Sequence, residues 1–249
     1  MKIALLFFGQ PRFLDNPLPY LKHKKFFLDK HDTDVYCHTW WEEEAKYDCS
    51  TWSRINTCET DKDAIKKIQQ MYKPVDLVFE SPKKFSFKAE SQESINQIIK
   101  KKWPRGHAHW NSNNDNYSNI LSQLYSIEQV CKLCAKSSEK YDFIVLSRFD
   151  NNIIEFPEDL HELDSGKFYI SDLHPRFPDM VYFFSQKFLE SQYFYSRVDY
   201  IIEKYKWSLW EPSNEAFKYF STIDFLNNES LFRPVRIRVK AVRDLTGSG

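Results

Sequence analysis

Tyr141-Asp-Phe-Ile-Val-Leu-Ser-Arg-Phe-Asp150 is the stretch of sequence that decides the fold. Its apolar run, Phe143 to Leu146, has the length of a buried strand and ends abruptly in polar and charged residues. Alternation along an extended chain predicts that Arg148 and Asp150 lie on the same side. Ligands of open α/β sheets bind just beyond the carboxyl ends of the strands. A cation and an anion there predict a site for a phosphate-bearing ligand with a metal ion. The alternative is a structural ion pair that closes the strand.

Further strand and helix patterns precede this segment. Strands are predicted at Ile3–Phe8, Asp34–Trp40 and Pro74–Phe79, and helical patterns at Leu21–Leu28 and Asp61–Met71 separate them. Alternating strands and helices are the signature of parallel βαβ units. We therefore expect an α/β fold, with a mostly parallel sheet flanked by helices.

A long helix is predicted from Ser118 onward by apolar residues that recur at helical spacing. Its buried face consists of Ile120, Leu124, Ile127, Cys131 and Cys134. A second face carries amide and hydroxyl groups without charges, namely Asn119, Gln123 and Ser126. Such a stripe suits a helix that borders a polar cleft, and an ordinary polar surface is the alternative.

Shorter patterns surround these elements. Strands are expected at Lys167–Ser171, Met180–Ser185 and Leu231–Val242, and a helix at Gln186–Tyr205. Residues 81–117 hold little periodicity, which predicts a long loop or lid. We expect one domain over residues 1–246, with residues 247–249 as a loose tail.

The composition excludes several classes of protein. Lysine plus arginine and aspartate plus glutamate balance at 35 each, so no overall basic field recruits nucleic acid. The sequence shows no RRM-like or helix-turn-helix-like pattern and no glycine-rich phosphate loop of the kinase type. The first apolar run, Ile3–Phe8, is too short for a signal peptide or a membrane span, so no transmembrane segment is expected.

The cysteines do not describe a disulfide framework. There are five, an odd number for a domain of this size. Cys131 and Cys134 form a Cys-x-x-Cys pair, but they share the apolar face of the predicted helix, and no second ligand pair completes a zinc site. We expect buried core thiols, which fit a reducing, cytoplasmic compartment.

Four motifs follow one another along the chain: Ile3–Arg12, Asp34–Trp40, Ser118–Ile127 and Tyr141–Asp150. In their order and spacing the chain resembles a family of small nucleotide-sugar-dependent glycosyltransferases of bacteria and large or marine viruses. That family is related to capsule and lipopolysaccharide glycosyltransferases of the WavE kind. A weaker match joins Asp179–Ser185 to the Ser213-Asn-Glu215 segment, so the resemblance covers roughly residues 1–220.

The resemblance implies a GT-A-type, Rossmann-like fold that places a nucleotide-sugar across the carboxyl edge of the sheet. It implies that the Gly9-Gln10-Pro11-Arg12 loop holds nucleotide and diphosphate. Glycine lets the backbone approach a ligand closely, and arginine forks onto phosphate. The other residues that we assign to the donor site are His38, Trp40, Asn119, Gln123, Ser126 and Arg148.

Arg148-Phe149-Asp150 stands where many relatives carry Asp-x-Asp, which bridges a divalent metal to the diphosphate. Only the second carboxylate is present here, and Arg148 is itself able to neutralise diphosphate charge. Mg²⁺ or Mn²⁺ with oxygen ligands remains the prediction, with Asp150 as the metal ligand and a UDP- or GDP-sugar as the donor.

Transfer requires stabilisation of the leaving nucleotide diphosphate, and a carboxylate to deprotonate the acceptor hydroxyl of a glycan. The candidates for that carboxylate are, in order, Asp179, Glu215 and Asp172, and each has a surface carboxylate or helix cap as its alternative reading. The rival function is a non-catalytic carbohydrate- or nucleotide-binding domain.

Overall fold

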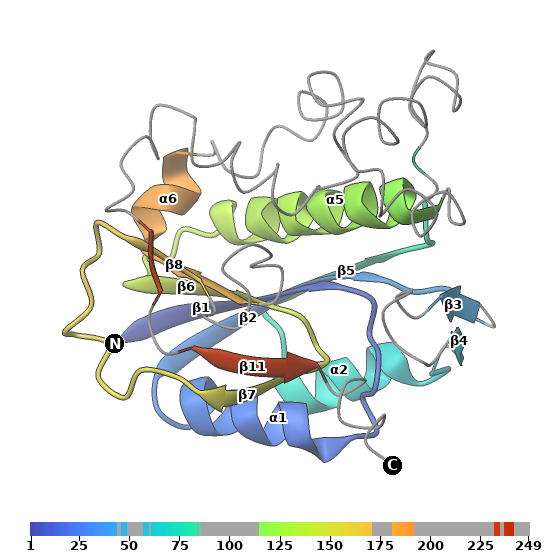
Figure 1. The fold of residues 1–249 in the computed structure, drawn as a ribbon, viewed down its shortest axis with the longest axis horizontal. Helices are drawn as coiled ribbons and strands as arrows, with labels where there is room; N and C mark the ends of the chain where they lie inside the picture. The colour runs from blue at the N-terminus through green and yellow to red at the C-terminus, as the bar shows by residue number, and fades with distance from the viewer. Residues whose placement is uncertain are drawn as a thin grey trace, which may run out of the picture.

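A seven-stranded sheet forms the centre of the molecule in a computed structural model of the chain (Figure 1). The structure describes residues 1–43, 46–48, 57–59, 61–83, 85, 115–170, 181–191, 232–234 and 237–241. The strand order is β10-β8-β9-β6-β1-β2-β5. The strands are β1 (Lys2–Gly9), β2 (Asp32–Trp40), β5 (Asp76–Glu80), β6 (Phe143–Ser147), β8 (Phe168–Ile170), β9 (Val181–Phe184) and β10 (Phe232–Pro234).

Six of these strands run in one direction. β9 pairs antiparallel with β6 and with β8, and the other neighbours pair parallel. The predicted α/β class with a mostly parallel sheet flanked by helices is therefore confirmed.

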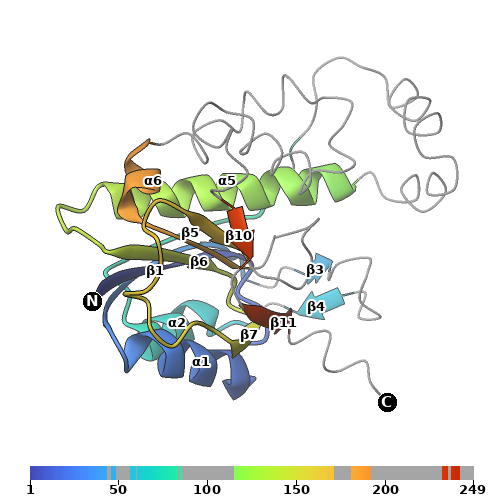
Figure 2. The ribbon, with the colours of Figure 1, turned by 60° about the vertical axis from the view of Figure 1, so that its left-hand side comes forward.

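Helices and a small ribbon cover the two faces of the sheet (Figures 1 and 2). One face carries α5 (Asp115–Ala135) and α6 (Gln186–Ser191). The other face carries α1 (Pro17–His23), α2 (Ala64–Tyr72) and an antiparallel ribbon of β7 (Asn151–Glu155) with β11 (Arg238–Ala241). A separate pair, β3 (Lys46–Asp48) with β4 (Thr57–Glu59), lies within the charged region after β2.

Strand β1 contributes side chains to two hydrophobic clusters, because successive residues of a strand point to opposite faces. Ile3, Leu5 and Phe7 pack on the side of α2 and the β7–β11 ribbon. Ala4, Leu6 and Phe8 pack on the side of α5 and α6. Burial on both faces explains why β1 and β6 read as continuous apolar runs in the sequence.

The structure differs from the sequence predictions in three places. The predicted helix at Leu21–Leu28 is the end of α1 followed by a π-helical turn, η1 (Lys24–Leu28). β7 was not predicted, because it is short and polar at its start. The single strand expected at Leu231–Val242 is two strands, β10 and β11, in different sheets.

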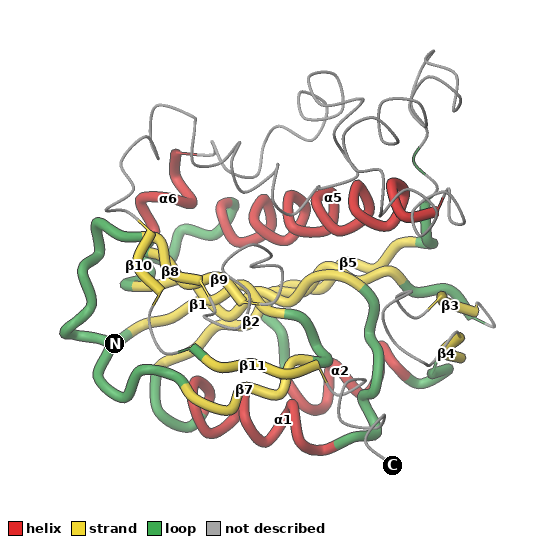
Figure 3. Tube along the Cα trace, in the orientation of Figure 1, coloured by secondary structure: helices red, strands yellow, loops and turns green. Residues whose placement is uncertain are grey.

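The carboxyl ends of β1, β2, β5 and β6 meet at one edge of the sheet, from which the loops in Figure 3 continue. Gly9 is level with Thr39, and Trp40 is level with Glu80. Ser147, the last residue of β6, is level with Phe7. Three of the four motifs therefore end at the same edge.

The helices in the described part of the chain include none with the length and apolar character that crossing a membrane requires.

Candidate functional site

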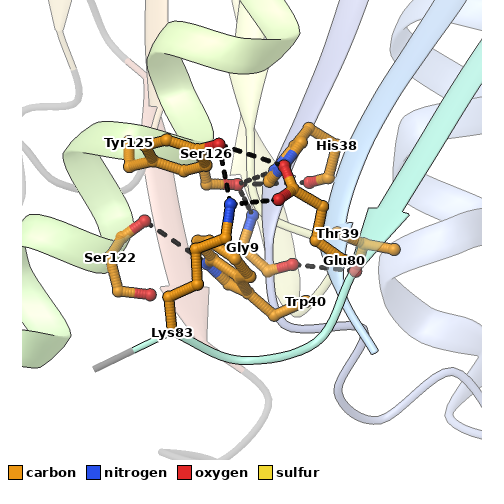
Figure 4. Close-up of polar contacts among 9 residues, drawn as sticks. All are labelled: Gly9, His38, Thr39, Trp40, Glu80, Lys83, Ser122, Tyr125 and Ser126. Carbon is orange, nitrogen blue, oxygen red and sulfur yellow. Dashed lines mark hydrogen bonds and ion pairs between the residues drawn. The ribbon is translucent and has the colours of Figure 1, made fainter. Parts of the chain in front are cut away.

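A connected set of polar contacts joins β1, β2, β5 and α5 at the carboxyl edge of the sheet (Figure 4). Ser126 on α5 lies at its centre. The Ser126 hydroxyl oxygen accepts a hydrogen bond from the Gly9 amide at 2.8 Å, and it lies 2.8 Å from Nδ1 of His38. On the other side of the ring, Nε2 of His38 lies 3.0 Å from Oε1 of Glu80.

Both backbone polar groups of Gly9 are bonded by side chains of neighbouring elements. Its N–H donates to Ser126, and its carbonyl accepts from the hydroxyl group of Thr39 on β2 at 2.8 Å. Gly9 has a φ of 90°, in the left-handed region that side-chain-bearing residues rarely adopt. A Cβ added here would meet no atom within 4 Å, so glycine is required by the backbone angle and the space beside it is open.

The hydrogen bonds define the protonation of His38. The Glu80 carboxylate only accepts, so Nε2 of His38 carries the proton that it shares with Glu80. Burial lowers the pKa of His38, although the bond to Glu80 works in the opposite direction, so the ring is neutral near pH 7. Nδ1 is then an acceptor, and the Ser126 hydroxyl donates to it. This tautomer is assigned from the network of contacts.

Glu80 is the charged end of the network. Partial burial works to raise the pKa of its carboxyl, but hydrogen bonds from Lys83 and His38 outweigh it and lower the pKa. Lys83 forms an ion pair with Glu80 and also donates to the hydroxyl group of Tyr125 at 2.9 Å. The Tyr125 hydroxyl in turn donates to Glu80 at 3.2 Å.

Aromatic rings pack around this charged end. The rings of Trp40 and Tyr125 stack with centroids 5.4 Å apart, and the ammonium group of Lys83 lies 4.5 Å from the centroid of Tyr125. The ring of Phe85 lies 5.7 Å from that of Tyr125. Trp40 is buried and donates from its indole N–H to the backbone oxygen of Ser122 at 3.3 Å, which fixes β2 against α5.

The loop after β1 is tightly folded. The amide of Arg12 donates to the carbonyl of Gln10 at 2.9 Å, and the guanidinium Nε donates to the Gln10 side chain. Phe13 has a φ of 56°, which is unusual for a residue with a bulky side chain and marks local strain. Asn16 then caps α1 by accepting from the amide of Leu18 at 3.0 Å. The half-buried Arg12 side chain is therefore held beside the carboxyl edge.

Arg148 and Asp150 form a two-pronged ion pair with each other. Nε of Arg148 lies 2.9 Å from Oδ1 of Asp150, and Nη2 lies 2.6 Å from Oδ2. The strand ends at Ser147 and the chain turns at once, so the two residues do not lie along an extended segment as predicted. Asp150 is 1% exposed. The alternative reading, an ion pair that closes the strand, is the geometry that the structure shows.

A buried histidine lies on the opposite face of the sheet from His38. Nδ1 of His23 lies 3.0 Å from the hydroxyl of Tyr72, and its ring packs edge-on against Phe7 with centroids 4.9 Å apart. Burial lowers the pKa of His23 to about 3, against a smaller raising effect of the Asp150 charge.

The structure brings several predicted donor-site residues together. Gly9, His38, Trp40 and Ser126 meet at the carboxyl edge, as expected. However, His38 and Ser126 are 0% exposed and Trp40 is 2% exposed, so these three side chains support the site from below its surface and do not line it.

The remaining predicted residues fall into two groups. Gln10, Arg12 and Gln123 are half-buried near the same edge. The side chain of Asn119 lies outside the described residues, as do Asp172, Asp179 and Glu215, so their assignments stay predictions.

Sequence reasoning missed Glu80, Lys83 and Tyr125. Glu80 follows the predicted strand Pro74–Phe79 directly, so the rule that functional groups follow strand ends would have found it. Tyr125 adjoins the predicted polar stripe in sequence, and only the tertiary structure shows that its hydroxyl group contacts Glu80.

The described residues do not assemble a metal site. They contain no group of three or more His, Cys, Asp or Glu side chains that is able to hold a metal ion. Both carboxylate oxygens of Asp150 accept from Arg148, so a divalent ion at Asp150 would share that carboxylate with the guanidinium group.

Two of the solved structures with a loosely similar arrangement of elements are glycosyltransferases. The first is the glycosyltransferase GlyE of Streptococcus pneumoniae TIGR4, with a TM-score of 0.39 and 11% identity over 94% of this chain. This chain spans 44% of the length of GlyE. The second is mouse xyloside xylosyltransferase 1, with a TM-score of 0.36 and 11% identity over 94% of this chain and 85% of the mouse protein. No protein-family model and no curated protein matches the chain. At these TM-scores the two structures carry no argument about function, which rests on the residues of this chain.

Proposed function

We propose that this protein transfers a sugar from a nucleotide-sugar donor to the hydroxyl group of a glycan acceptor. The observation that carries the proposal is the meeting of the Gly9–Arg12 loop, the end of β2 and the Arg148–Asp150 turn at one carboxyl edge. Ligands of open α/β sheets bind at such an edge. The motifs that resemble nucleotide-sugar glycosyltransferases thus cluster where a donor is expected.

The chemistry of the edge suits a diphosphate. Arg12 follows a backbone turn with open space beside Gly9, so a ligand has room to approach the main chain. Arginine binds phosphate oxygens through a planar fork of N–H groups. As the sugar departs, negative charge gathers on the nucleotide diphosphate, and a positioned guanidinium group stabilises that charge more in the transition state than in the ground state. We assign this role to Arg12.

The metal requirement belongs to the proposal as a separate, testable part. Mg²⁺ or Mn²⁺ at the diphosphate follows from the resemblance, whereas the described residues offer Asp150 only in its pair with Arg148. A divalent ion held by Asp150 would lie beside the Arg148 guanidinium group, which shares the same carboxylate.

The acceptor side of the reaction is proposed from the sequence alone. Asp179 is our first candidate for the general base or an acceptor ligand, followed by Glu215 and Asp172. A UDP- or GDP-sugar is the donor that we propose, and the cytoplasm is the compartment.

A panel of donors tests the proposal. Thermal unfolding of the protein is recorded with UDP-, GDP-, CMP- and dTDP-sugars, each with and without Mn²⁺. We expect one nucleotide to raise the unfolding temperature, since a ligand at about 100 times its Kd stabilises the folded state by roughly 2.7 kcal/mol. If none of the donors shifts the transition, the assignment of the carboxyl edge as a donor site is wrong.

Turnover separates the enzyme from its rival, the non-catalytic binding domain. Nucleotide-sugar glycosyltransferases slowly hydrolyse their donor without acceptor, and a binding domain does not. Release of free nucleotide from the donor that binds, measured over hours and compared with the Arg12→Ala variant, supports the enzyme. Binding without any release supports the rival.

A further inference from the structure

Gly9 is the last residue of β1 and the first residue of the Gly9–Arg12 loop. Two side chains of other elements hold its backbone in place. Its amide donates to Ser126 on α5, and its carbonyl accepts from Thr39 on β2. The left-handed φ of Gly9 is therefore maintained by two side chains that belong to other elements. Because both backbone polar groups of Gly9 are bonded, the direction in which the loop leaves the sheet is fixed.

The Ser126 hydroxyl is itself held by His38. It lies 2.8 Å from Nδ1 of His38 and 3.2 Å from the backbone carbonyl of the same residue. Neither side chain is exposed, so neither touches a ligand. The half-buried Glu80 orients His38. The Glu80 carboxylate forms an ion pair with Lys83 and accepts a hydrogen bond from Tyr125, and Lys83 also donates to Tyr125.

Resting on the proposed function, we infer that Ser126, His38 and Glu80 are positioning residues for the donor loop. Hydrogen bonds through these three residues connect β5 and α5 to the Gly9 amide. The positions of these two elements therefore fix the position of the amide. Through Gly9 this chain of hydrogen bonds sets the direction of Arg12 toward the diphosphate. The three residues bind no donor themselves, and they act on affinity only through the loop.

The hydrogen bonds of this series all run in the same direction from donor to acceptor, beginning at Gly9 and ending at Glu80. Gly9 donates to Ser126, Ser126 donates to Nδ1 of His38, and Nε2 of His38 donates to Glu80. Each group has one defined role, and every buried donor in the chain has an acceptor. If His38 is protonated, Ser126 is able to turn its hydroxyl to the His38 carbonyl and still accept from Gly9. The anchor therefore survives protonation of the ring, as expected of a positioning device and not of a pH switch.

A Ser–His–Glu order also occurs in hydrolases, but here the serine is inaccessible. Ser126 is 0% exposed, and its oxygen already accepts from the Gly9 amide. A nucleophile has to reach its substrate, so this hydroxyl group serves structure and not covalent catalysis.

The decisive variant is Ser126→Ala, with Ser122→Ala as its matched control. Ser122 lies one turn earlier on α5, and only its backbone oxygen takes part in the contacts of Figure 4. Two readouts are needed. The first, independent of any ligand, is the hydrogen-exchange rate of the Gly9 amide by NMR. The second is the Kd of the donor nucleotide, with KM and kcat.

We expect Ser126→Ala to speed exchange at Gly9 by about 10-fold or more and to raise the nucleotide Kd by about 3- to 30-fold, because a buried donor loses its acceptor. KM should rise by the same factor, and kcat should fall as well, since a displaced Arg12 stabilises the leaving diphosphate less in the transition state. Ser122→Ala should resemble the wild type in both readouts.

Two conservative substitutions at His38 test the two hydrogen bonds of its ring one at a time, because each keeps a polar side chain at this position. The amide of asparagine reaches the Nδ1 position and that of glutamine reaches the Nε2 position. His38→Asn should preserve the contact to Ser126 and hence Gly9 protection, whereas His38→Gln should preserve the contact to Glu80 and lose part of the protection. These variants decide the question if Ser126→Ala does not fold.

Each result has a defined meaning. Wild-type exchange at Gly9 in Ser126→Ala overturns the chain of hydrogen bonds, as does equal behaviour of the two His38 variants. Fast exchange with an unchanged Kd overturns the positioning role. A wild-type protein that binds none of the donors overturns the proposed function and the nucleotide part of this inference, whereas the exchange rates still decide whether Ser126 holds Gly9.

Discussion

At the scale of single residues, the effect of the Arg148–Asp150 pair on stability can be measured separately from its effect on activity. Both side chains are largely buried and make two charge-assisted hydrogen bonds to each other. Removing one partner of such a pair leaves a charge without its counter-ion, whereas replacing both by apolar residues is often neutral for stability.

We predict that Asp150→Ala lowers the free energy of unfolding by roughly 3 kcal/mol, and that the double variant Arg148→Met with Asp150→Leu regains most of it. Urea unfolding measures both. If the pair also serves the donor, the double variant is stable and inactive. An active double variant would show that the pair only closes the strand.

Arg12 is the residue on which donor binding depends most directly in our proposal. Arg12→Ala should weaken nucleotide binding by roughly 1.5–3 kcal/mol, the range for hydrogen bonds to charged groups. Arg12→Lys should restore only part, because an ammonium group does not reproduce the planar fork. Calorimetric titration of the nucleotide measures this, with Lys140→Ala as a charge-matched control at the exposed amino side of β6. Unchanged affinity in Arg12→Ala would move the phosphate site to Arg148.

At the scale of elements, α5 joins the core and the candidate site through different faces. Cys131 and Cys134 pack into the cluster beneath the helix, and both are buried. Burial raises the pKa of Cys131 well above its usual value and raises the pKa of Cys134 to about 12. The prediction of core thiols is therefore confirmed, and neither thiol forms a reactive thiolate at neutral pH.

Alkylation tests this packing. In the native protein at pH 8, iodoacetamide should leave the peptides of Cys131, Cys134 and the buried Cys37 unmodified, and it should modify all three after unfolding in urea. Mass spectrometry of the peptides gives the extent of reaction. Rapid native labelling of Cys131 and Cys134 would mean that α5 leaves the sheet in solution.

The elements that the sequence predicted well are those whose burial is simple. β1 and β6 are covered on both faces, which produces uninterrupted apolar runs of strand length. β7 is covered on one face, begins with two asparagines and follows a tight turn, so no run of that kind marks it. The positions of Gly9 and His38 followed from the rule that sites lie at strand ends. Their burial, and the pairing of Arg148 with its own neighbour, depend on tertiary contacts that residue spacing does not contain.

At the scale of the whole molecule, two histidines that are buried without charge on opposite faces of the sheet link stability to pH. Burial lowers the pKa of both His23 and His38. In the unfolded chain a histidine takes up a proton below about pH 6.5, whereas folded His23 does so only near pH 3. The unfolded state therefore binds more protons in this range, and stability present above pH 6.5 is lost as the pH falls toward 3.

We predict that His23→Phe reduces the slope of unfolding free energy against pH by up to about 1.4 kcal/mol per pH unit between pH 5.5 and 4. Tyr72→Phe is the control, because it removes the hydrogen bond to His23 but leaves the titrating ring, so stability falls while the slope remains. Urea unfolding at a series of pH values measures both. An unchanged slope in His23→Phe would mean that the ring is charged in the folded protein.

β10 and β11 pair with strands that lie far earlier in the chain. β11 completes the ribbon with β7, and β10 completes one side of the large sheet beside β8. About 80 residues of chain separate Glu155 from its partner Arg238. A ribosome that adds roughly 5–20 residues per second takes several seconds to cover that distance. During translation β7 therefore keeps an unpaired edge until β11 has been made, and an unpaired edge is open to pairing with another chain.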